Sequence, residues 1–179
     1  MESINQYINM RTLIVGDVNS GKTRQTIEIM HLFLKAGYAK KMFVLDFAPG
    51  DKEGIGNKMT PPPDTDLVYL TSSITAPRLT GKDESHIMKL AEDNANIIES
   101  LFIKFYQHQR DILFINDVTL YFHAGNFEKI SRLIYSTPTV VINAYDGQTF
   151  ADSKLTRREK KMTRDLMKMC DRVITMTIS

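Results

Sequence analysis

Eight residues near the N-terminus, Gly16-Asp-Val-Asn-Ser-Gly-Lys-Thr23, have the types and the spacing that phosphate binding requires. Gly16 and Gly21 permit backbone conformations and close approaches that a side chain would block, so backbone N–H groups can surround an anion. Lys22 adds a mobile positive charge for the β- and γ-phosphates, and the hydroxyl of Thr23 is a suitable ligand for Mg²⁺. The run predicts a nucleoside triphosphate site formed by Gly16, Asn19, Ser20, Gly21, Lys22 and Thr23.

The residues on either side of this loop favour the same interpretation. An apolar run, Thr12–Val15, precedes the loop, and an amphipathic stretch from Gly21 to about Lys35 follows it and closes near Gly37. A helix in this place would direct its positive N-terminal end at a bound phosphate. A glycine-rich turn without a ligand is the alternative, and the strand–loop–helix context makes it the weaker one.

A second apolar run ends in an acid that could complete the site. Ile112–Ile115 has the pattern of a buried strand, and Asn116 and Asp117 follow it directly. In phosphate sites an aspartate in this place holds Mg²⁺, usually through water, and Thr23 would lie on the other side of the ion. The alternative is an aspartate that caps the end of the strand, but the phosphate loop favours the metal role.

Residues 16–23 and 112–117 resemble the Walker A and Walker B motifs of P-loop NTPases. This resemblance implies binding of ATP or GTP together with Mg²⁺, with Thr23 and Asp117 flanking the ion. Many P-loop ATPases carry a glutamate directly after the Walker B aspartate to polarise the attacking water, whereas this chain has Val118 there. The departure predicts slow intrinsic hydrolysis that a partner, or an arginine supplied in trans, would stimulate.

Lys22 and Asp46 are the candidates for a direct part in catalysis. Asp46 ends the apolar run Met42–Leu45 and could face the γ-phosphate. An aspartate does so at the equivalent strand end in dethiobiotin-synthetase-like P-loop proteins, which this feature resembles. The alternative is a turn-forming residue, because a base must also reach its proton. Asp17, inside the loop, is expected to face solvent.

Two polar residues after another apolar run concern which nucleobase the site would recognise. Asn143 and Asp146 follow the apolar run Thr139–Ile142 and resemble the guanine-reading N-K-x-D motif of GTPases, although Ala144 replaces the lysine. A loop with a turn-forming Asp146 is the favoured alternative. ATP is therefore the expected nucleotide, and GTP read by Asn143 and Asp146 is the alternative.

Seven basic residues lie close together near the C-terminus. A solvated helix face is the favoured interpretation, and the alternatives are a phosphate sensor, an arginine finger or a contact to nucleic acid. Arg157 and Arg158 are the best sensor candidates because they start the helix after a flexible loop, and Arg78 is another. Nucleic acid is not the favoured partner. The residues are Lys154, Arg157, Arg158, Lys160, Lys161, Arg164 and Lys168.

The elements that must position these residues alternate between strands and helices. The apolar runs are continuous, which is typical of parallel strands covered on both faces. We expect an α/β protein: a three-layer P-loop NTPase fold with a mostly parallel sheet flanked by helices. The order after Asp117 looks like the RecA-like core of ATP-dependent corrinoid adenosyltransferases. Besides the runs already named, the expected strands are Leu67–Leu70 and Arg172–Met176.

Three further helices can be placed by their apolar spacing and caps. An apolar stripe predicts a long helix over 83–109, and Asn126 is expected to cap a shorter one. Thr156-Arg-Arg-Glu159 has a capping-box pattern that would open the last helix. The segment 48–66, rich in proline and glycine, predicts a long mobile loop inside a single nucleotide-binding domain covering 1–179.

Composition limits the remaining possibilities. The chain has 179 residues, a formal net charge of +2 and one cysteine, Cys170, so it is the size of one domain and forms no internal disulfide. The four histidines lack ligand spacing and are expected at the surface or half-buried. The absence of a basic N-terminal region and of a long apolar run predicts a cytoplasmic protein without a membrane segment.

Three functions are consistent with these residues. The first is an Mg²⁺-dependent, ATP-preferring protein with slow hydrolysis that a protein partner stimulates. The second is an ATP-dependent transferase or kinase, in which Asp46 acts as base and the 48–66 loop folds over a small acceptor. The third is a GTP-binding switch or a nucleotide sensor without catalysis.

Overall fold

The protein is built around one six-stranded sheet. In the computed structural model, which describes residues 3–50 and 57–177, all strand pairs are parallel and the strand order is β3-β2-β4-β5-β1-β6. The parallel sheet predicted from the apolar runs is thereby confirmed. The strands are β1 (Arg11–Gly16), β2 (Met42–Asp46), β3 (Val68–Thr71), β4 (Ile112–Asn116), β5 (Thr139–Tyr145) and β6 (Arg172–Met176).

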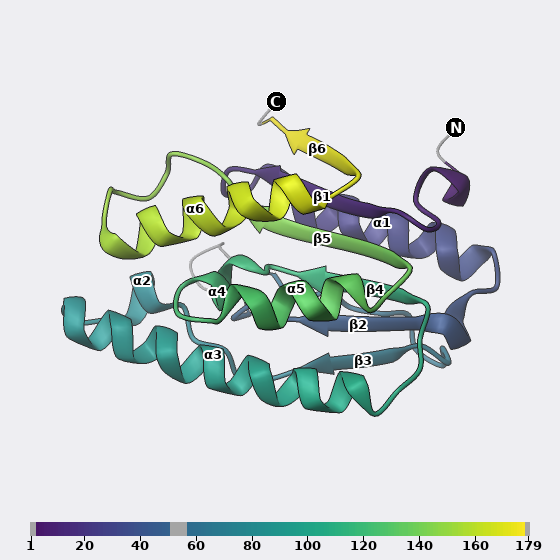
Figure 1. Cartoon of the computed structure of the whole chain (residues 1–179), viewed down its shortest axis with the longest axis horizontal. Coiled ribbons are helices and arrows are strands. Elements are labelled where there is room, and N and C mark those ends of the chain that lie inside the picture. Colours follow the sequence, from purple (N-terminus) through teal and green to yellow (C-terminus); the bar gives the residue numbers. More distant parts are fainter. Residues whose placement is uncertain (1–2, 51–56, 178–179) are drawn as a thin grey trace.

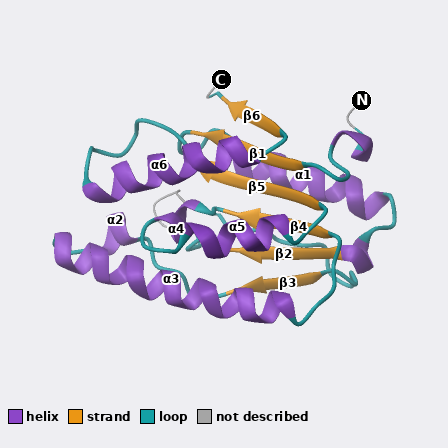
Figure 2. Ribbon diagram, in the orientation of Figure 1, coloured by secondary structure: helices purple, strands orange, loops and turns teal. Residues whose placement is uncertain are grey.

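Helices cover both faces of the sheet, which makes three layers (Figure 1). Helix α1 packs on one face, and α3, α5 and α6 pack on the other (Figure 2). No helix in the described part of the chain is both long and apolar enough to span a bilayer. The helices are α1 (Lys22–Lys35), α2 (Pro77–Thr80), α3 (Glu84–Tyr106), α4 (Thr119–Phe122), α5 (Phe127–Tyr135) and α6 (Lys154–Met169); two short 3₁₀ turns cover Ile4–Gln6 and Ala39–Lys41.

The continuous apolar runs arise because alternate residues of each strand enter different cores. Leu13 and Val15 of β1 pack in the core beneath α3, α5 and α6, whereas Ile14 packs in the core beneath α1. Each of these side chains is at most 1% exposed. A strand buried on both faces has no polar side to alternate with its apolar one.

The cap of α5 matches the sequence pattern, whereas α3 ends at Tyr106, before the expected 109, and the start of α6 also differs. The side chain of Asn126 accepts a hydrogen bond from the Glu128 N–H at 2.8 Å, so the expected cap of α5 is confirmed. Helix α6 begins earlier than the pattern predicted, because its N-cap is Ser153, whose hydroxyl accepts from the Thr156 N–H. The expected capping box over Thr156–Glu159 was therefore wrong. Both residues lie within the helix, and Glu159 is wholly buried.

The segment after β2 is more firmly anchored than its composition predicted. Met59 is 2% exposed, and its N–H donates to the buried carboxylate of Asp46. Lys58 donates through Nζ to the carbonyl of Ser72 at 3.0 Å. The loop expected over 48–66 is thus tied down at 58–59, and its part 51–56 lies outside the described residues.

The sheet brings the polar ends of distant strands to one edge. Gly16 of β1 is opposite Tyr145 of β5, and Asp46 of β2 is opposite Asn116 of β4. Ligands of open parallel sheets bind outside the carboxyl ends of the strands, where the connecting loops separate. The fold therefore gathers the candidate residues of four loops at this edge.

Phe114 tests the importance of the core beneath α1. Its ring is fully buried and meets the ring of Phe33 edge-on, with centroids 5.9 Å apart. Replacing a buried phenylalanine leaves a cavity, so we expect Phe114→Ala to lower the free energy of unfolding by about 3–5 kcal/mol. Urea denaturation measures this loss. Ile103→Ala is the control, since Ile103 is 64% exposed and its truncation should change stability by less than about 0.5 kcal/mol.

Candidate phosphate-binding site

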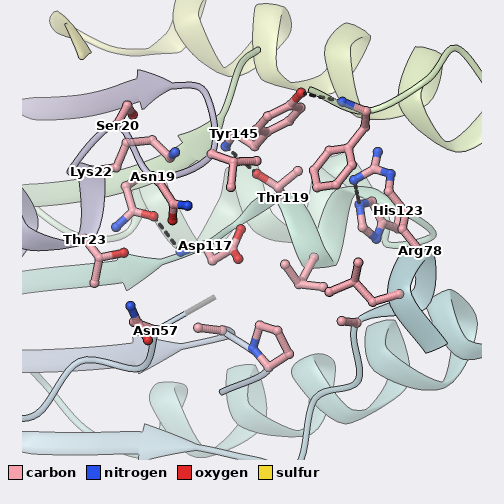
Figure 3. A pocket seen from close by; sticks show the side chains of 18 of the residues that line it. Asn19, Ser20, Lys22, Thr23, Asn57, Arg78, Asp117, Thr119, His123 and Tyr145 are labelled. Atoms are coloured by element: carbon pink, nitrogen blue, oxygen red, sulfur yellow. Dashed lines mark hydrogen bonds between the residues drawn. The ribbon is translucent and has the colours of Figure 1, made fainter. Parts of the chain in front are cut away.

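A cavity of about 330 Å³ lies at the carboxyl edge of the sheet. The loop after β1 forms one wall, and α2 and α4 form the opposite wall (Figure 3). Figure 3 places Asn19, Ser20 and Lys22 at one end, Arg78 and His123 at the other, and Asp117 between them. Residues 18–24, from the loop and the first turn of α1, all line it, and the segment after β2 adds Ala48, Pro49 and Asn57.

The loop 16–23 has the backbone geometry that its glycines predicted. Gly21 has φ 87° and is the N-cap of α1, and Asn19 also lies in the left-handed region with φ 57°. A Cβ on Gly16 would come within 2.5 Å of the Ser20 hydroxyl and 2.7 Å of the Met176 carbonyl. Only glycine fits at position 16, because backbone approaches it from the neighbouring strand.

Lys22 provides a positive charge at this end of the cavity. Its Nζ donates a hydrogen bond of 2.5 Å to the carbonyl of Asp17. Burial lowers the pKa of Lys22, while the negative charges of Asp117 and Asp17 oppose the shift. The ammonium group is held within the loop and faces the side of the cavity where Asp117 lies (Figure 3).

Asp117 is the acid of the cavity. It follows β4 with a left-handed backbone, φ 57°, and its N–H donates to the Asn143 side chain at 2.8 Å. Burial raises the pKa of Asp117 to about 7; Lys22 opposes this rise, whereas the charges of Glu159 and Asp46 add to it. A carboxylate in this environment is stabilised by any cation that enters the cavity.

Asn116 is a buried residue behind the cavity wall whose importance the sequence reasoning missed. Its Oδ1 accepts from the Thr23 hydroxyl at 3.3 Å and from Asn143 Nδ2 at 2.8 Å. Thr23 and Asp117 both line the cavity as expected, but the direct partner of the Thr23 hydroxyl is Asn116. The signal was its position as the last residue of a buried strand, where an amide has to find partners.

The carboxylate of Asp46 is surrounded by hydrogen-bond donors of the protein. Its carboxylate is wholly buried and accepts hydrogen bonds of 2.5–3.0 Å from Asn116 Nδ2, the N–H groups of Ala48 and Met59, and the Tyr69 hydroxyl. Asp46 is not among the residues that line the cavity. The expected catalytic base is thus placed behind Asn116, where it anchors the loop after β2, and this geometry favours a structural role.

Asn143 lines the cavity but Asp146 does not, so the two residues do not form a pair facing it. Asn143 is 2% exposed, and its amide is used by Thr26, Asn116 and the Asp117 N–H. Asp146 is exposed and lies outside the cavity lining. The amide of Asn143 braces the site from β5, because its nitrogen donates to Thr26 and Asn116 and its oxygen accepts from the Asp117 N–H.

The two expected phosphate sensors also point elsewhere. Arg157 is exposed and pairs with Asp152 at 3.4 Å. Arg158 donates from Nε to the Phe122 carbonyl at 3.1 Å and from its terminal nitrogen to the Gly125 carbonyl at 2.7 Å. Neither arginine lines the cavity, so the structure does not bring them to the phosphate loop.

Arg78 does line the cavity, as part of a buried cluster. Its guanidinium donates to Glu159 at 2.8 Å and stacks over Phe150 with its centre 4.4 Å from the ring centroid. His123 Nε2 is also 2.8 Å from Glu159. Burial lowers the pKa of His123, although Glu159 opposes the shift. His123 is 2% exposed, so the expectation of four surface or half-buried histidines was wrong here.

Asp17 ties the phosphate loop to the segment that carries Phe150. It was expected to face solvent, but its carboxylate accepts from the Thr149 hydroxyl at 2.6 Å and from the Gln148 N–H at 3.0 Å. Burial alone would raise the pKa of Asp17, and these hydrogen bonds lower it overall. A Cβ on Gly147 would come within 2.3 Å of the Asp17 Cγ, so glycine permits this contact.

Comparison with known proteins adds no family assignment, because no protein-family model and no curated protein matches the sequence.

The raised pKa of Asp117 predicts a pH-dependent effect on stability. Its ordinary value is 3.8, so between about pH 4 and pH 7 folding takes up a proton at this carboxyl. Wild type should therefore lose stability relative to Asp117→Asn as the pH rises through this range, and the variant should melt at the higher temperature at pH 8. Thermal unfolding in EDTA without nucleotide, from pH 4 to pH 8, measures the difference. A gap that is constant with pH would contradict the assignment.

Proposed function

We propose that this protein binds a nucleoside triphosphate together with Mg²⁺, prefers ATP, and hydrolyses it slowly unless a partner completes the site. The observation that carries the proposal is the conformation of loop 16–23. The loop turns at Asn19 and Gly21, ends at the first residue of α1, and holds Lys22 beside Asp117 in one cavity. This combination has no evident use in a turn that binds nothing.

The chain supplies three kinds of group for a triphosphate. The first turn of α1 has N–H groups without helical partners, and its dipole favours an anion. Lys22 would exchange the carbonyl of Asp17 for phosphate oxygens, which are stronger partners for an ammonium group. Ser20 and Asn19 line the same end of the cavity. These residues bind and orient the phosphates.

Thr23 and Asp117 would hold the magnesium ion. No cluster of three or more histidine, cysteine or acidic residues able to bind a metal occurs within residues 3–50 and 57–177. Mg²⁺ usually takes only one or two protein oxygens and completes its shell with water and substrate phosphates, so the donor set fits. Burial raises the pKa of Asp117, so a divalent cation beside this carboxylate would favour its charged form. Bound Mg²⁺ would neutralise charge on the phosphates.

The expected slow hydrolysis depends on which groups at the carboxyl edge of the sheet could activate the attacking water. Val118 is fully buried, so the position after Asp117 offers no base. Asp46 is occupied by four donors and lies outside the cavity lining. Among the residues that the structure describes, Asp117 is the one acid in the cavity lining, so it would have to serve both the metal and the attacking water. A partner that contributes a cation or orients the water would raise the rate.

The preference for ATP rests on the absence of a guanine-reading pair in the described residues. The Asn143 amide is committed to its protein partners, and Asp146 lies outside the cavity. Discrimination of guanine requires an acceptor for its N–H groups at the base. GTP binding by Asn143 and Asp146 is therefore the weaker alternative.

A transferase is the second candidate, and the length of the cavity favours it. Beyond Asp117 the cavity continues toward Arg78 and His123, away from loop 16–23 (Figure 3). A small acceptor there would lie next to the γ-phosphate. Comparing the amounts of ADP and inorganic phosphate released distinguishes the two functions, because hydrolysis yields them in equal amounts and transfer yields less phosphate than ADP.

Binding is tested by thermal unfolding with Mg–ATP and with Mg–GTP. Ligand binding to the native state stabilises it by RT ln(1 + [L]/Kd), which is about 2.7 kcal/mol at a hundredfold excess over Kd. We expect a larger shift with ATP than with GTP, and we expect Lys22→Ala to lose it. Lys35→Ala is the matched control, because Lys35 is exposed in the last turn of the same helix.

The other outcomes of this experiment would change the proposed function in different ways. No shift with either nucleotide would refute the proposal. A larger shift with GTP would overturn the ATP preference and leave nucleotide binding intact. A shift with ATP but no ADP formed over many hours would replace the slow NTPase with a nucleotide sensor that does not catalyse.

A further inference from the structure

Positive charge is concentrated on one helix of this protein. Helix α6 contains seven of the 23 lysines and arginines in the chain but only two of its 21 acids. The rest of the chain is left with sixteen basic and nineteen acidic residues and is therefore net negative. The net charge of +2 conceals this separation, because it averages a basic helix with an acidic remainder.

The basic residues form a stripe along the outer face of α6. Arg157, Lys160, Lys161, Arg164 and Lys168 recur every three or four positions, which places them on one side of a helix. Together with Asp165 they line a groove on the surface. At a rise of about 1.5 Å per residue, the stripe from 157 to 168 is about 17 Å long.

These cations are available to a partner. Lys160 and Arg164 form no ion pair within the described residues. Lys161 and Lys168 share Asp165, at 3.2 and 2.8 Å, and both lysines are more than 70% exposed. Exposed ion pairs contribute little because water screens them, so these side chains can exchange Asp165 for a stronger anion.

The chemistry of the stripe favours a polymer of phosphates over a membrane. The apolar residues of α6, such as Met162 and Leu166, are buried in the core against the sheet. A helix that binds a bilayer needs an exposed apolar face beside its basic one, and α6 has none. Double-stranded DNA carries one negative charge per about 1.7 Å of its axis, so it matches a basic stripe along the whole length of the helix.

We propose that the exposed face of α6 binds the phosphate backbone of a nucleic acid, without selecting a base sequence. Arginine recognises phosphate through two parallel N–H groups, and the lysines add point charges. The buried face of the same helix carries Glu159, which holds Arg78 at the cavity. The outer face is thus free for nucleic acid while the cavity holds a nucleotide.

Fluorescence anisotropy with a labelled 20-base-pair DNA duplex and with the corresponding single strand tests this proposal. The variant is the double charge reversal Lys160→Glu/Arg164→Glu. Its matched control is Lys35→Glu/Lys104→Glu, which changes the net charge equally at two exposed positions of α1 and α3. Melting temperatures without ligand show that all three proteins are folded.

We expect the wild-type protein to bind DNA with a strong dependence on salt. With about four phosphate contacts, the slope of log K against log salt is about −3 to −4. The α6 reversal should weaken binding at least about tenfold, because it removes two contacts and adds repulsion, whereas the control should change it less than about threefold.

Three results would overturn the proposal. They are no DNA binding by the wild type at low salt, equal losses in the α6 variant and its control, or equally tight binding of polyglutamate or of phosphatidylserine vesicles. The thermal shift with Mg–ATP, measured on the same variants, keeps this proposal separate from nucleotide binding. That shift is expected to persist in both double variants, since neither changes the phosphate loop.

Discussion

A buried amide at the end of β4 is the constraint on which the site depends. In a parallel sheet covered on both faces, polar groups at the strand ends cannot reach water and must find partners within the protein. Asn116 meets this requirement by donating to Asp46 of β2 at 2.8 Å while accepting from Asn143 of β5 and from Thr23 of α1. Three neighbouring strands and the helix after loop 16–23 are thereby fixed relative to one another, which sets the shape of the cavity.

The conformation of Asp117 follows from the same network. Asn143 is held by Asn116 and Thr26, and its free oxygen accepts the Asp117 N–H, which turns the backbone to φ 57°. An aspartate tolerates this left-handed conformation better than most residues do. The turn ends the strand and places the carboxylate beside Lys22, in the cavity. The acid and the lysine oppose each other's pKa shifts, so each makes the charge of the other less costly.

The sequence predicted what depends on local pattern and missed what depends on distant partners. The strands, the cap at Asn126 and the loop at 16–23 are each defined by a few consecutive residues. The position of Asp46 is decided instead by Asn116, seventy residues away, and that of His123 by Glu159, thirty-six residues away. An isolated acid or histidine looks the same in the sequence whether it faces a cavity or a buried partner. The apolar pattern therefore predicted the layers of the protein. The direction of each polar side chain depends on contacts between distant residues, which form only in the folded protein.

Glu159 explains why the pattern at the start of α6 was misleading. A threonine followed three residues later by a glutamate suits a helix cap, but a cap is exposed and this glutamate is wholly buried. Its carboxylate would be costly to bury alone, and the guanidinium of Arg78 at 2.8 Å compensates for it. The pair joins α6 to α2 across one end of the cavity. A helix whose outer face is basic is thus fixed by its one buried acid to the wall of the cavity, so a shift of α6 would move Arg78 with it.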